Sequence, residues 1–574
     1  MNRIMALWQA RLHWTRCARF LYNCYRGHAD LVIRDSEDRL AMLLYGISTL
    51  PLISELQDSE ITQCWYADDS SAQGKFENIY AWWNKLNLHG PAHGYFPQGN
   101  KSYLVVHPED LSEAQQLFQG TGIKLVTGQR FLGGFIGERK QEYVKDKICK
   151  WVEAIKTLSE AGNAQPQSAH AAFTKSIQFK WQYLQRVTNG DELGYKPLQE
   201  VIQSSFIPAL IGGEVPREEL DLFSLPVNKG GLAISDPTKM VKLAYDTSRN
   251  GSICLIRSLE DRTTFSINDH LTKLREEKKN ATTEKDLQEN QLLQRILDSL
   301  PDDRRRAIER SVSNISQNRT SGWLSVLPIQ RQNFDLSPCE FRDALAVRYK
   351  RNPIDAPRSC DGCGSGVFSL EHALSCKKGG LVTRRHNEIR DVLGDLMSIA
   401  WGNCCKEPII KEASDLSPGL RGDLACRGVW EPQREALFDV RVVDTDAPSY
   451  VTRPVNVVLT AAEEEKKRKY VSACEQRHAS FTPLVCSADA KFVPQMTAFL
   501  KVISERLADK WGRPHETVRG WVKVRLAFAI LRATSMCVRG ARKKWRNVED
   551  ILGMDGAGLR IGSEGQEGQL FKMD

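Results

Sequence analysis

A group of cysteines and one histidine in the segment CDGCGSGVFSLEHALSC has the spacing of a metal site. Two residues separate Cys360 from Cys363, and three separate His372 from Cys376. The first pair forms a metal knuckle, and the second pair, on a following helical turn, completes a tetrahedral Zn²⁺ site. Four protein ligands leave no open position for a reacting water, so the sequence predicts a structural zinc ion. The simpler alternative is a set of buried thiols beside an ordinary helix.

Two aspartates on neighbouring segments could carry out hydrolysis. The stretches RGDLACRGVW (421–430) and EALFDVRVVD (435–444) are predicted as short strands. Alternation along the second places its apolar residues on one face and Asp439 with Arg441 on the other. Asp423 begins the first strand, so the two carboxylates could converge on Mg²⁺ that activates a water against a phosphodiester. Aspartates at such a separation also occur together by chance.

A second pair of carboxylates lies in WYADDSSAQG (65–74), where Asp68 and Asp69 are adjacent. On a strand-turn-strand hairpin they could hold the divalent metals of nucleotidyl transfer. Alone the pair is weak evidence, because aspartate is simply a good turn residue.

The elements around this turn predict an α+β domain. Residues 76–88, FENIYAWWNKLNL, carry the apolar stripe of an amphipathic helix. YLVV (103–106) and KLVTG (124–128) are predicted as strands, and RFLGGFIG (130–137) as a sharp hairpin. From about 145 to 255 the pattern becomes helical. Its candidate core residues are Trp151, Phe173, Phe179, Trp181 and Leu184.

Charge and composition indicate the class of protein. The chain has 574 residues, 41% hydrophobic and 26% charged, which is enough for several buried cores. A net charge of +8 is concentrated in DDRRRAIER (302–310) and VRGARKKWR (538–546), which favours a polyanionic partner. The start, MNRIMALWQARLHWTR, lacks the apolar core of a signal peptide, and we expect a soluble intracellular protein. Fifteen cysteines in such a protein are then free thiols and metal ligands rather than disulfides.

The first part of the chain resembles the later palm and thumb of non-LTR retrotransposon reverse transcriptases. The resemblance covers about residues 1–255 and rests on an ordered set of motifs: MLLYGISTLPLI, CWYADDSSAQG, GYFPQGNKSYLVV, GQRFLGGFIG, AFTKSIQFKWQYLQRV and FIPALIGGEVPREELDLFSLPVNKGGLAI. It implies that Asp68 and Asp69 match the metal-binding aspartates of the family. It also implies that Lys101 matches a basic residue near the incoming nucleotide.

Two departures from the family pattern predict an inactive polymerase region. Two-metal polymerisation needs a further carboxylate, which in the family lies upstream of the stretch matching NRIMALWQARLHW, so the chain is expected to begin after it. At LVIRDSEDRLAMLLYG (31–46) the family has a glycine-containing loop ending in Gly-Asp-Pro. Here Glu37, Asp38 and Arg39 run directly into Leu40.

The later part, about 335–545, resembles the restriction-like endonuclease region of site-targeting non-LTR retrotransposons. The motifs are FRDALAVRYKRNP, the cysteine cluster, RRHNEIRD, RGDLACRGVW, ALFDVRVVDTDAPSY, EEEKKRKY and FTPLVCSADA. The resemblance implies a PD-(D/E)xK core, with Asp423 and Asp439 binding Mg²⁺. It also implies a helical lysine, and either Lys466 or Lys467, near Tyr470, could supply it.

Two positions of this region depart from the general nuclease pattern, and a third offers a further carboxylate. Gly422 replaces the usual proline. Arg441 stands where the general nuclease pattern has lysine, and it can stabilise phosphate but cannot act as a base. Glu407 is a weaker candidate for an additional acid.

A basic segment between the cysteine cluster and the first aspartate-containing strand is a candidate nucleic-acid interface. KKGGLVTRRHNEIRD (377–391) offers Arg384, Arg385, His386 and Arg390, which on a helix could contact phosphates. The implied partners are DNA and retroelement RNA, and a protein that cleaves target DNA would act in the nucleus.

We therefore predict a multidomain α+β protein, in which a partial palm and helical thumb precede a zinc-stabilised mixed α/β nuclease core. The regions, in chain order, are a partial palm (1–145), a thumb-like helical region (146–260), a charged helical linker (261–334), a zinc-binding region (335–400), an endonuclease region (401–545) and a disordered tail (546–574). The predicted activity is metal-dependent nicking of DNA. The alternative is a non-catalytic, zinc-containing nucleic-acid-binding protein.

Overall fold

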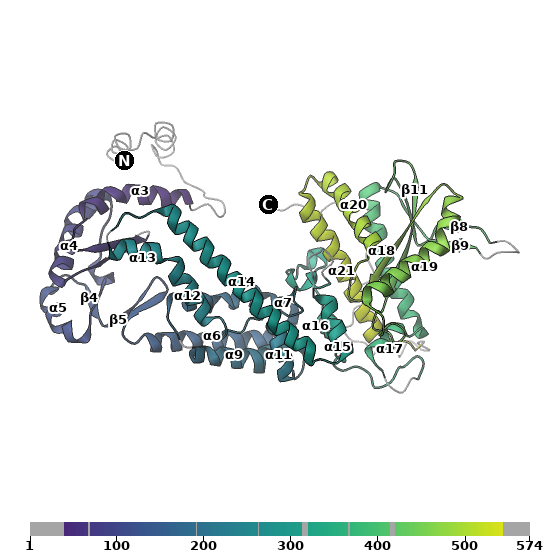
Figure 1. Ribbon diagram of the computed structural model, residues 1–574, viewed down its shortest axis with the longest axis horizontal. Coiled ribbons are helices and arrows are strands. Elements are labelled where there is room, and N and C mark those ends of the chain that lie inside the picture. The colour runs from purple at the N-terminus through teal and green to yellow at the C-terminus, as the bar shows by residue number, and fades with distance from the viewer. Residues whose placement is uncertain are drawn as a thin grey trace, which may run out of the picture. The chain divides into compact units, whose positions relative to one another are not determined.

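The structure is a computed structural model of a mixed α/β protein with small sheets and many helices (Figure 1). The residues that it describes are 39–66, 69–190, 192–261, 263–312, 320–364, 368–413 and 419–543. The tail expected to be disordered (546–574), the stretch before Arg39 and the aspartate at position 68 lie outside these ranges. Among the described residues, no helix is both long enough and apolar enough to span a membrane.

The chain divides into two compact units. The first comprises Met1–Lys147, Arg186–Asn189 and Tyr245–Lys278. The second comprises Ile148–Gln185, Gly190–Ala244 and Lys279–Asp574.

The first unit contains the predicted helix, strands and hairpin. Its elements are α3 (Arg39–Glu55), β1 (Thr62–Tyr66), β2 (Asp69–Gln73), α4 (Phe76–His89), β3 (Tyr103–Val105), α5 (Leu111–Leu117), β4 (Lys124–Val126), β5 (Gly128–Phe131), β6 (Gly134–Gly137), α12 (Val241–Gly251) and α13 (Ile253–Glu260). The described strands pair two by two, β1 with β2, β3 with β4 and β5 with β6.

The helix α4 forms where the sequence predicts it because its apolar residues serve two small cores. Trp82, Trp83 and Leu86 are buried against α3, while Ile79 also packs toward the core around Phe118. The predicted hairpin forms as well. Its two central residues, Leu132 and Gly133, both have positive φ, at 45° and 83°, as a two-residue turn between twisted strands requires.

A helical layer opens the second unit. Its helices are α6 (Lys140–Ala164), which belongs to this unit from Ile148 onward, α7 (Pro166–Ala172), α8 (Phe179–Val187), which belongs to it up to Gln185, α9 (Lys196–Val201), α10 (Ile207–Ile211) and α11 (Arg217–Ser224). Phe173 stacks on Phe206 with ring centroids 4.5 Å apart, and Trp181 and Leu184 are buried beside them.

One predicted core residue of this layer is wrong, since Phe179 is 51% exposed. The cause is local geometry. Residues 173–177 form a π-helical turn, so the side-chain spacing of a regular α-helix does not continue through it. Trp181 and Leu184, three apart on α8, then take the face directed at the core.

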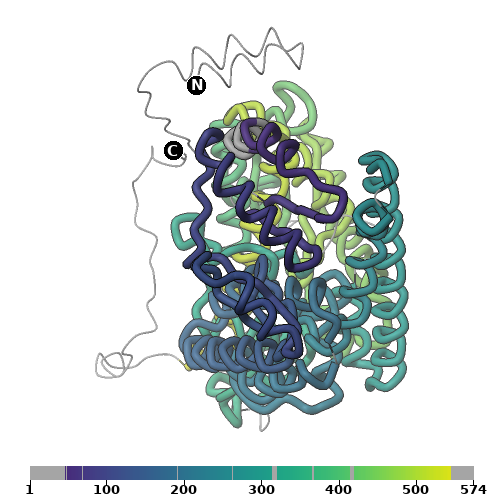
Figure 2. The backbone as a smooth tube through the Cα atoms, turned by 90° about the vertical axis from the view of Figure 1, so that its left-hand side faces the viewer, coloured from purple at the N-terminus to yellow at the C-terminus, as the bar shows by residue number. Residues whose placement is uncertain are grey.

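The segment expected to be charged and helical forms α14 (Ile267–Ser299) and α15 (Asp302–Ser311). In Figure 2, α14 is the teal helix at the right-hand edge. Most of α14 is exposed, and Lys229 contacts it through Asp286 and Glu289 at 2.6 and 2.9 Å. By contrast, α15 is partly buried, because Arg310 on its last turn forms ion pairs with Asp446, at 2.7 Å, and with Asp489.

The remaining part of the second unit is built on a four-stranded sheet. Its strands, in spatial order, are β12 (Ser480–Ser487), β11 (Glu435–Val443), β10 (Leu424–Arg427) and β7 (Cys404–Lys406). The strand β12 runs parallel to β11, whereas β10 is antiparallel to both of its neighbours. A short hairpin of β8 (Ile409–Lys411) and β9 (Leu420–Arg421) lies outside this sheet.

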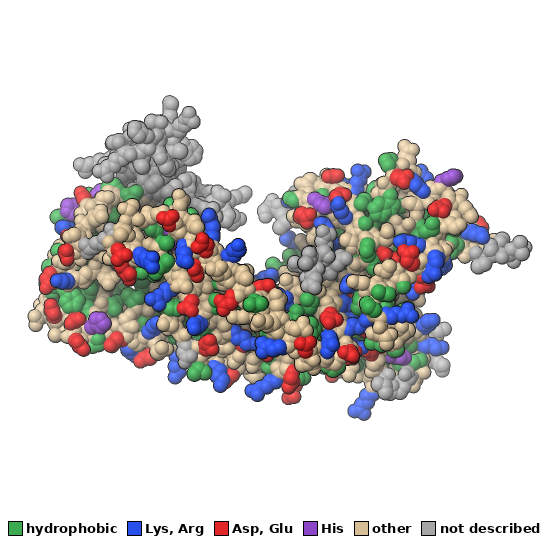
Figure 3. All heavy atoms as spheres, viewed as in Figure 1, with side chains coloured by type: hydrophobic (Ala, Val, Ile, Leu, Met, Phe, Trp, Pro, Cys, Tyr) green, Lys and Arg blue, Asp and Glu red, His purple; other side chains and the backbone are tan. Residues whose placement is uncertain are grey.

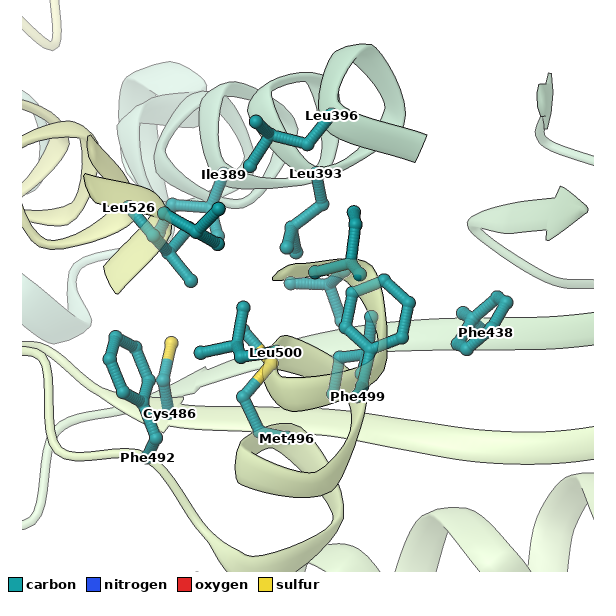
Figure 4. Close-up of a cluster of buried hydrophobic side chains, with 14 of the residues drawn as sticks. Ile389, Leu393, Leu396, Phe438, Cys486, Phe492, Met496, Phe499, Leu500 and Leu526 are labelled. Atoms are coloured by element: carbon teal, nitrogen blue, oxygen red, sulfur yellow. The ribbon is translucent and has the colours of Figure 1, made fainter. Parts of the chain in front are cut away.

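Helices cover both faces of the sheet. One face packs against α18 (Leu381–Trp401), α20 (Pro494–Trp511) and α21 (His515–Arg539), in a core that includes Leu393, Phe438 and Phe499 (Figure 4). The other face is covered by α19 (Val455–Glu475), where Leu437 packs with Tyr470. This helix is the crossover that joins parallel strands β11 and β12. Because β11 is buried on both sides, any polar side chain on it needs a partner.

His170 on α7 gives a test of packing in the helical layer. Burial lowers its pKa to about 4, partly opposed by the hydrogen bond of its Nε2 with Leu232 O at 2.8 Å. Below pH 6.5 the imidazole of His170 is protonated in the unfolded chain but stays neutral in the folded chain. The free energy of unfolding therefore decreases as the pH falls from about 6.5 to about 4. At pH 5 the loss is about 2 kcal/mol. We expect the urea midpoint of His170→Gln to fall less between pH 7 and pH 5 than that of the wild type. The exposed His107→Gln is the control, and equal pH dependence in all three proteins would contradict the prediction.

Candidate functional site

The structure brings Asp423 and Asp439 side by side. The register of β10 and β11 pairs Leu424 with Phe438, and its continuation by one residue places Asp423 opposite Asp439. The Asp423 N–H donates to Phe438 O at 3.0 Å, which holds the pairing to the end of the strand. The Val440 N–H donates to Asp423 Oδ2 at 2.6 Å and fixes the orientation of the carboxylate.

His386 reaches the same carboxylate from α18. Its Nε2 lies 3.0 Å from Asp423 Oδ2 and 3.1 Å from Val440 O. Since both of these atoms are acceptors, we assign the proton to Nε2. Burial by itself lowers the pKa of His386, but the hydrogen bond and charge of Asp423 outweigh it, and the pKa is raised. Sequence reasoning assigned His386 to phosphate contact, whereas here it holds Asp423.

Lys466 reaches the second carboxylate from α19. Its Nζ lies 2.5 Å from Asp439 Oδ2, and the Asp439 side chain is only 5% exposed. Among the described residues, Oδ2 receives no hydrogen bond of regular geometry, so the contact is an ion pair. Lys467, the other candidate in the sequence, pairs instead with Glu464 at 2.8 Å on its own helix. The structure therefore separates two lysines that the sequence could not.

Tyr470, one turn after Lys466, is part of the wall behind the carboxylates. It is buried, and its ring stacks on Phe481 with centroids 4.9 Å apart. Burial raises the pKa of Tyr470 strongly, and the nearby Asp439 adds to the effect. The phenol is therefore neutral at physiological pH and does not act as a base.

An open groove with a volume of about 680 Å³ runs beside these residues. Basic side chains and one acid line it, together with three valines: Arg385, His386, Arg441, Lys466, Arg468, Lys469, Glu465, Val382, Val440 and Val442. The acid, Glu465, is paired with Arg441 at 2.5 Å. Lys and Arg side chains are also frequent on the visible face around α19 and toward α17 (Leu370–Ser375) (Figure 3). The groove therefore favours an anionic ligand.

Arg468 and Lys469 were missed by sequence reasoning. The signal was present, because residues 465, 468 and 469 follow the i, i+3, i+4 spacing that puts side chains on one face of a helix. Lys466 and Lys469 also both lie over the Tyr470 ring, with Nζ at 5.7 and 4.8 Å from its centroid.

Two further candidates are engaged within the protein. Arg390 is buried and forms contacts with Glu407 at 2.6 Å and with Asp391 at 3.1 Å. The Glu407 carboxylate is thus bound by an arginine, while its backbone N–H donates to Asp423 O at 2.9 Å. Arg384, in contrast, is exposed on α18.

The four predicted zinc ligands come together in space. The ligand atoms of Cys360, Cys363, His372 and Cys376 all lie within 4.8 Å of one another. Cys360 Sγ is 3.9 Å from Cys376 Sγ, and Cys363 Sγ is 3.4 Å from His372 Nε2. Two sulfurs that share a tetrahedral ion at about 2.3 Å lie about 3.8 Å apart, so the donor set fits zinc.

The chemistry of Cys360 supports the same assignment. Burial raises the pKa of its thiol, but hydrogen bonds from the Cys363 backbone, from His372 and from the Gly362 backbone outweigh burial, and the pKa falls to about 6. At neutral pH this cysteine is therefore a thiolate, the form that binds metal.

The zinc-type loop is held by an arginine that sequence reasoning assigned differently. The backbone N–H of Arg542 donates to Asp361 Oδ2 at 2.7 Å, and its Nη2 donates to Ala373 O at 3.0 Å. Arg542 belongs to the basic cluster VRGARKKWR, taken from sequence as a sign of a polyanionic partner. It is buried, so it fastens the end of the described chain to this loop.

The polymerase-type residues are less organised. Asp69 pairs with Tyr66 at the end of the β1–β2 hairpin and is exposed. Lys101 ends a short 3₁₀ segment, Gly99–Lys101, and is also exposed. Among the described residues, neither a hydrogen bond nor an ion pair joins them. Position 68 lies outside the description.

Zinc binding can be measured directly. We expect the purified full-length protein to carry stoichiometric zinc. Removing a ligand in Cys376→Ser should weaken the affinity for zinc at least about 100-fold, since even indirect supports of metal ligands contribute 10- to 100-fold. Elemental analysis of the purified proteins gives the result. The exposed Cys149→Ser serves as the control, and equal zinc content in the two variants would contradict the assignment.

The chain was compared with protein-family models and with curated proteins. No family model matches it, and none of the curated proteins is similar enough to count as a match. The retrotransposon resemblance therefore stays a prediction from the sequence motifs.

Proposed function

We propose that this protein is a metal-dependent phosphodiesterase that nicks DNA, with Asp423, Asp439 and Lys466 at its centre. The observation that supports this most is the meeting of the three side chains. The two carboxylates lie opposite each other on paired strands, and the lysine reaches one of them at 2.5 Å from the helix that covers the sheet.

The residues present fit a divalent cation. Asp439 Oδ2 is buried, and among the described residues its partner is the Lys466 ammonium at 2.5 Å, an ion pair without a regular hydrogen bond. The Asp423 carboxylate faces it from the neighbouring strand, so two carboxylates are available at one point. Carboxylate oxygens are the ligands that Mg²⁺ prefers. When bound, the metal would lower the pKa of a water and neutralise charge on the scissile phosphate.

The other residues have roles that follow from their contacts. His386 and the Val440 N–H hold Asp423 in one orientation. The Lys466 ammonium now stabilises the negative charge of Asp439. In the complex with DNA it would also stabilise the negative charge that develops on the scissile phosphate. Arg441, Arg468 and Lys469 on the groove would bind backbone phosphates, which set affinity rather than sequence choice.

We infer that the Cys/His group holds a structural zinc ion in support of this region. Cys360 and Cys376 are buried in a cluster that includes Leu381, at the start of α18, and Cys537 on α21. Zinc would thus stabilise the base of the same helix that carries His386. Four ligands leave it no catalytic position.

We propose nucleic-acid binding, rather than polymerisation, for the palm-like unit. Its described strands form three separate two-stranded sheets instead of one palm sheet, and Asp69 and Lys101 are exposed without contact to each other. Exposed aromatic residues such as Phe96 (69%) offer surfaces on which bases could stack.

A second candidate function is nucleic-acid binding without cleavage throughout the protein. One observation favours it. Lys466 pairs with Asp439, and His386 pairs with Asp423, so each carboxylate already has a cationic or donor partner within the protein.

The matched lysines provide the test. Nicking of supercoiled plasmid by the full-length protein in Mg²⁺ should fall at least about 100-fold in Lys466→Ala, the size of effect seen when one positioned charge is removed from an active site. Lys467→Ala removes only a partly exposed ion pair with Glu464 on the same helix and should change the rate less than about threefold.

Equal loss in both variants, or nicking insensitive to both, would overturn the role of Lys466. DNA binding by the wild type with no nicking in Mg²⁺ or Mn²⁺ would replace the proposal by the second candidate.

A further inference from the structure

Arg385 is a buried cation for which the described residues supply no hydrogen-bond partner. It lies on α18, is 3% exposed, and its Nε and Nη1 are buried without an acceptor among the described residues. Arg384, its neighbour in sequence, points to solvent on the same helix. The two arginines of this segment therefore differ fully in environment, although the sequence treats them alike.

An unpaired buried guanidinium is costly, because it has lost its hydration without gaining a counter-charge. Asp444 is a buried carboxyl on which the charge of Arg385 acts. Burial raises the pKa of Asp444 to about 6, and the charges of Arg310 and Arg385 oppose this shift, yet no ion pair or hydrogen bond joins the side chains of Arg385 and Asp444. The fold thus holds a positive charge whose partner is not supplied by the described residues.

The position of Arg385 indicates where that partner would come from. Arg385 lines the open groove together with Arg441 and Lys466. Val382, Val440 and Val442 form its apolar wall, and an apolar surrounding strengthens a charge-assisted hydrogen bond. His386, the next residue along α18, touches Asp423. Consecutive residues of one helix thus serve the groove and the carboxylate centre.

We propose that Arg385 binds a phosphate group of the bound strand. This phosphate would be adjacent to the scissile phosphate at the metal site of Asp423 and Asp439. A guanidinium presents a planar fork of donors that matches phosphate oxygens in pairs, which a lysine cannot do. Because Nε and Nη1 are buried, such a paired contact requires the Arg385 side chain to turn toward the groove. The inference rests on the proposed function for the identity of the ligand as a phosphodiester strand. It adds that recognition requires a flanking phosphate, so that a strand end lacking this phosphate is a poor substrate.

The test uses the full-length protein without divalent cations, so that cleavage plays no part, and inorganic phosphate and pyrophosphate as probes. Affinity is measured by calorimetry and stability by thermal unfolding. Arg385→Gln should weaken binding of pyrophosphate at least about tenfold, which corresponds to the loss of one charge-assisted pair. It should also raise the unfolding temperature of the phosphate-free protein, because the unpaired buried charge is gone. Arg384→Gln should change the affinity less than about twofold.

Two results would overturn the inference. One is pyrophosphate binding that is equal in Arg385→Gln and the wild type. The other is a wild type whose unfolding temperature does not rise with pyrophosphate, a result that stands even if Arg385→Gln does not fold. A lower unfolding temperature in Arg385→Gln with unchanged protection by pyrophosphate would instead assign Arg385 to the support of Asp444.

Failure of the inference and failure of the proposed function are separable. If the protein binds pyrophosphate through Arg385 but does not nick DNA in Mg²⁺, the proposed nuclease activity is refuted and phosphate binding by Arg385 stands. Nicking that depends on Lys466 but is indifferent to Arg385→Gln would do the reverse.

Discussion

The antiparallel pairing of β10 with β11 is the constraint on which the candidate site depends. Side chains directly opposite each other on such strands have Cβ atoms about 5 Å apart, so the register that pairs Leu424 with Phe438 also brings Asp423 to Asp439. A shift by one residue would turn every side chain of β10 to the other face and remove the site. The register is held because Leu424 and Phe438 are both fully buried in the core.

The rest of this region secures that sheet and brings further groups to it. The helix α18 contributes His386 from one face, and the crossover α19 contributes Lys466 from the other. Between them lies the groove, where positive charge and apolar wall meet. The zinc-type loop is fastened near the base of α18, and Arg310 of α15 is paired with acids that follow β11 and β12.

Much of this arrangement could be predicted from the sequence, because it depends on local patterns. The spacing of Cys360, Cys363, His372 and Cys376 predicts a group that the structure does assemble. Alternation predicted β11, the strand that carries Asp439, while Asp423 lies just before β10 rather than in it. The choice between Lys466 and Lys467 was beyond such reasoning. The two lysines are adjacent in sequence on a helix rich in charged residues. Only the packing of α19 on the sheet decides which of them reaches Asp439.

Charge patterns were the least informative, for a physical reason. The basic clusters at 302–310 and 538–546 indicated an external polyanion, but Arg310 and Arg542 are buried and bound to groups of the protein itself. A sequence does not show whether a positive charge meets solvent or a distant carboxylate. Likewise, Phe179 was predicted in the core because the pattern was taken as an uninterrupted α-helix, and the π-helical turn before it changes the face.

Binding of Mn²⁺, followed by the electron paramagnetic resonance of the free ion, tests the central claim most directly. The zinc-loaded full-length protein is compared with Asp423→Asn/Asp439→Asn at equal concentration and equal zinc content. The account predicts that the wild type binds at least one more Mn²⁺ ion per chain than the double variant. Equal binding by the two proteins would show that Asp423 and Asp439 do not form a metal centre.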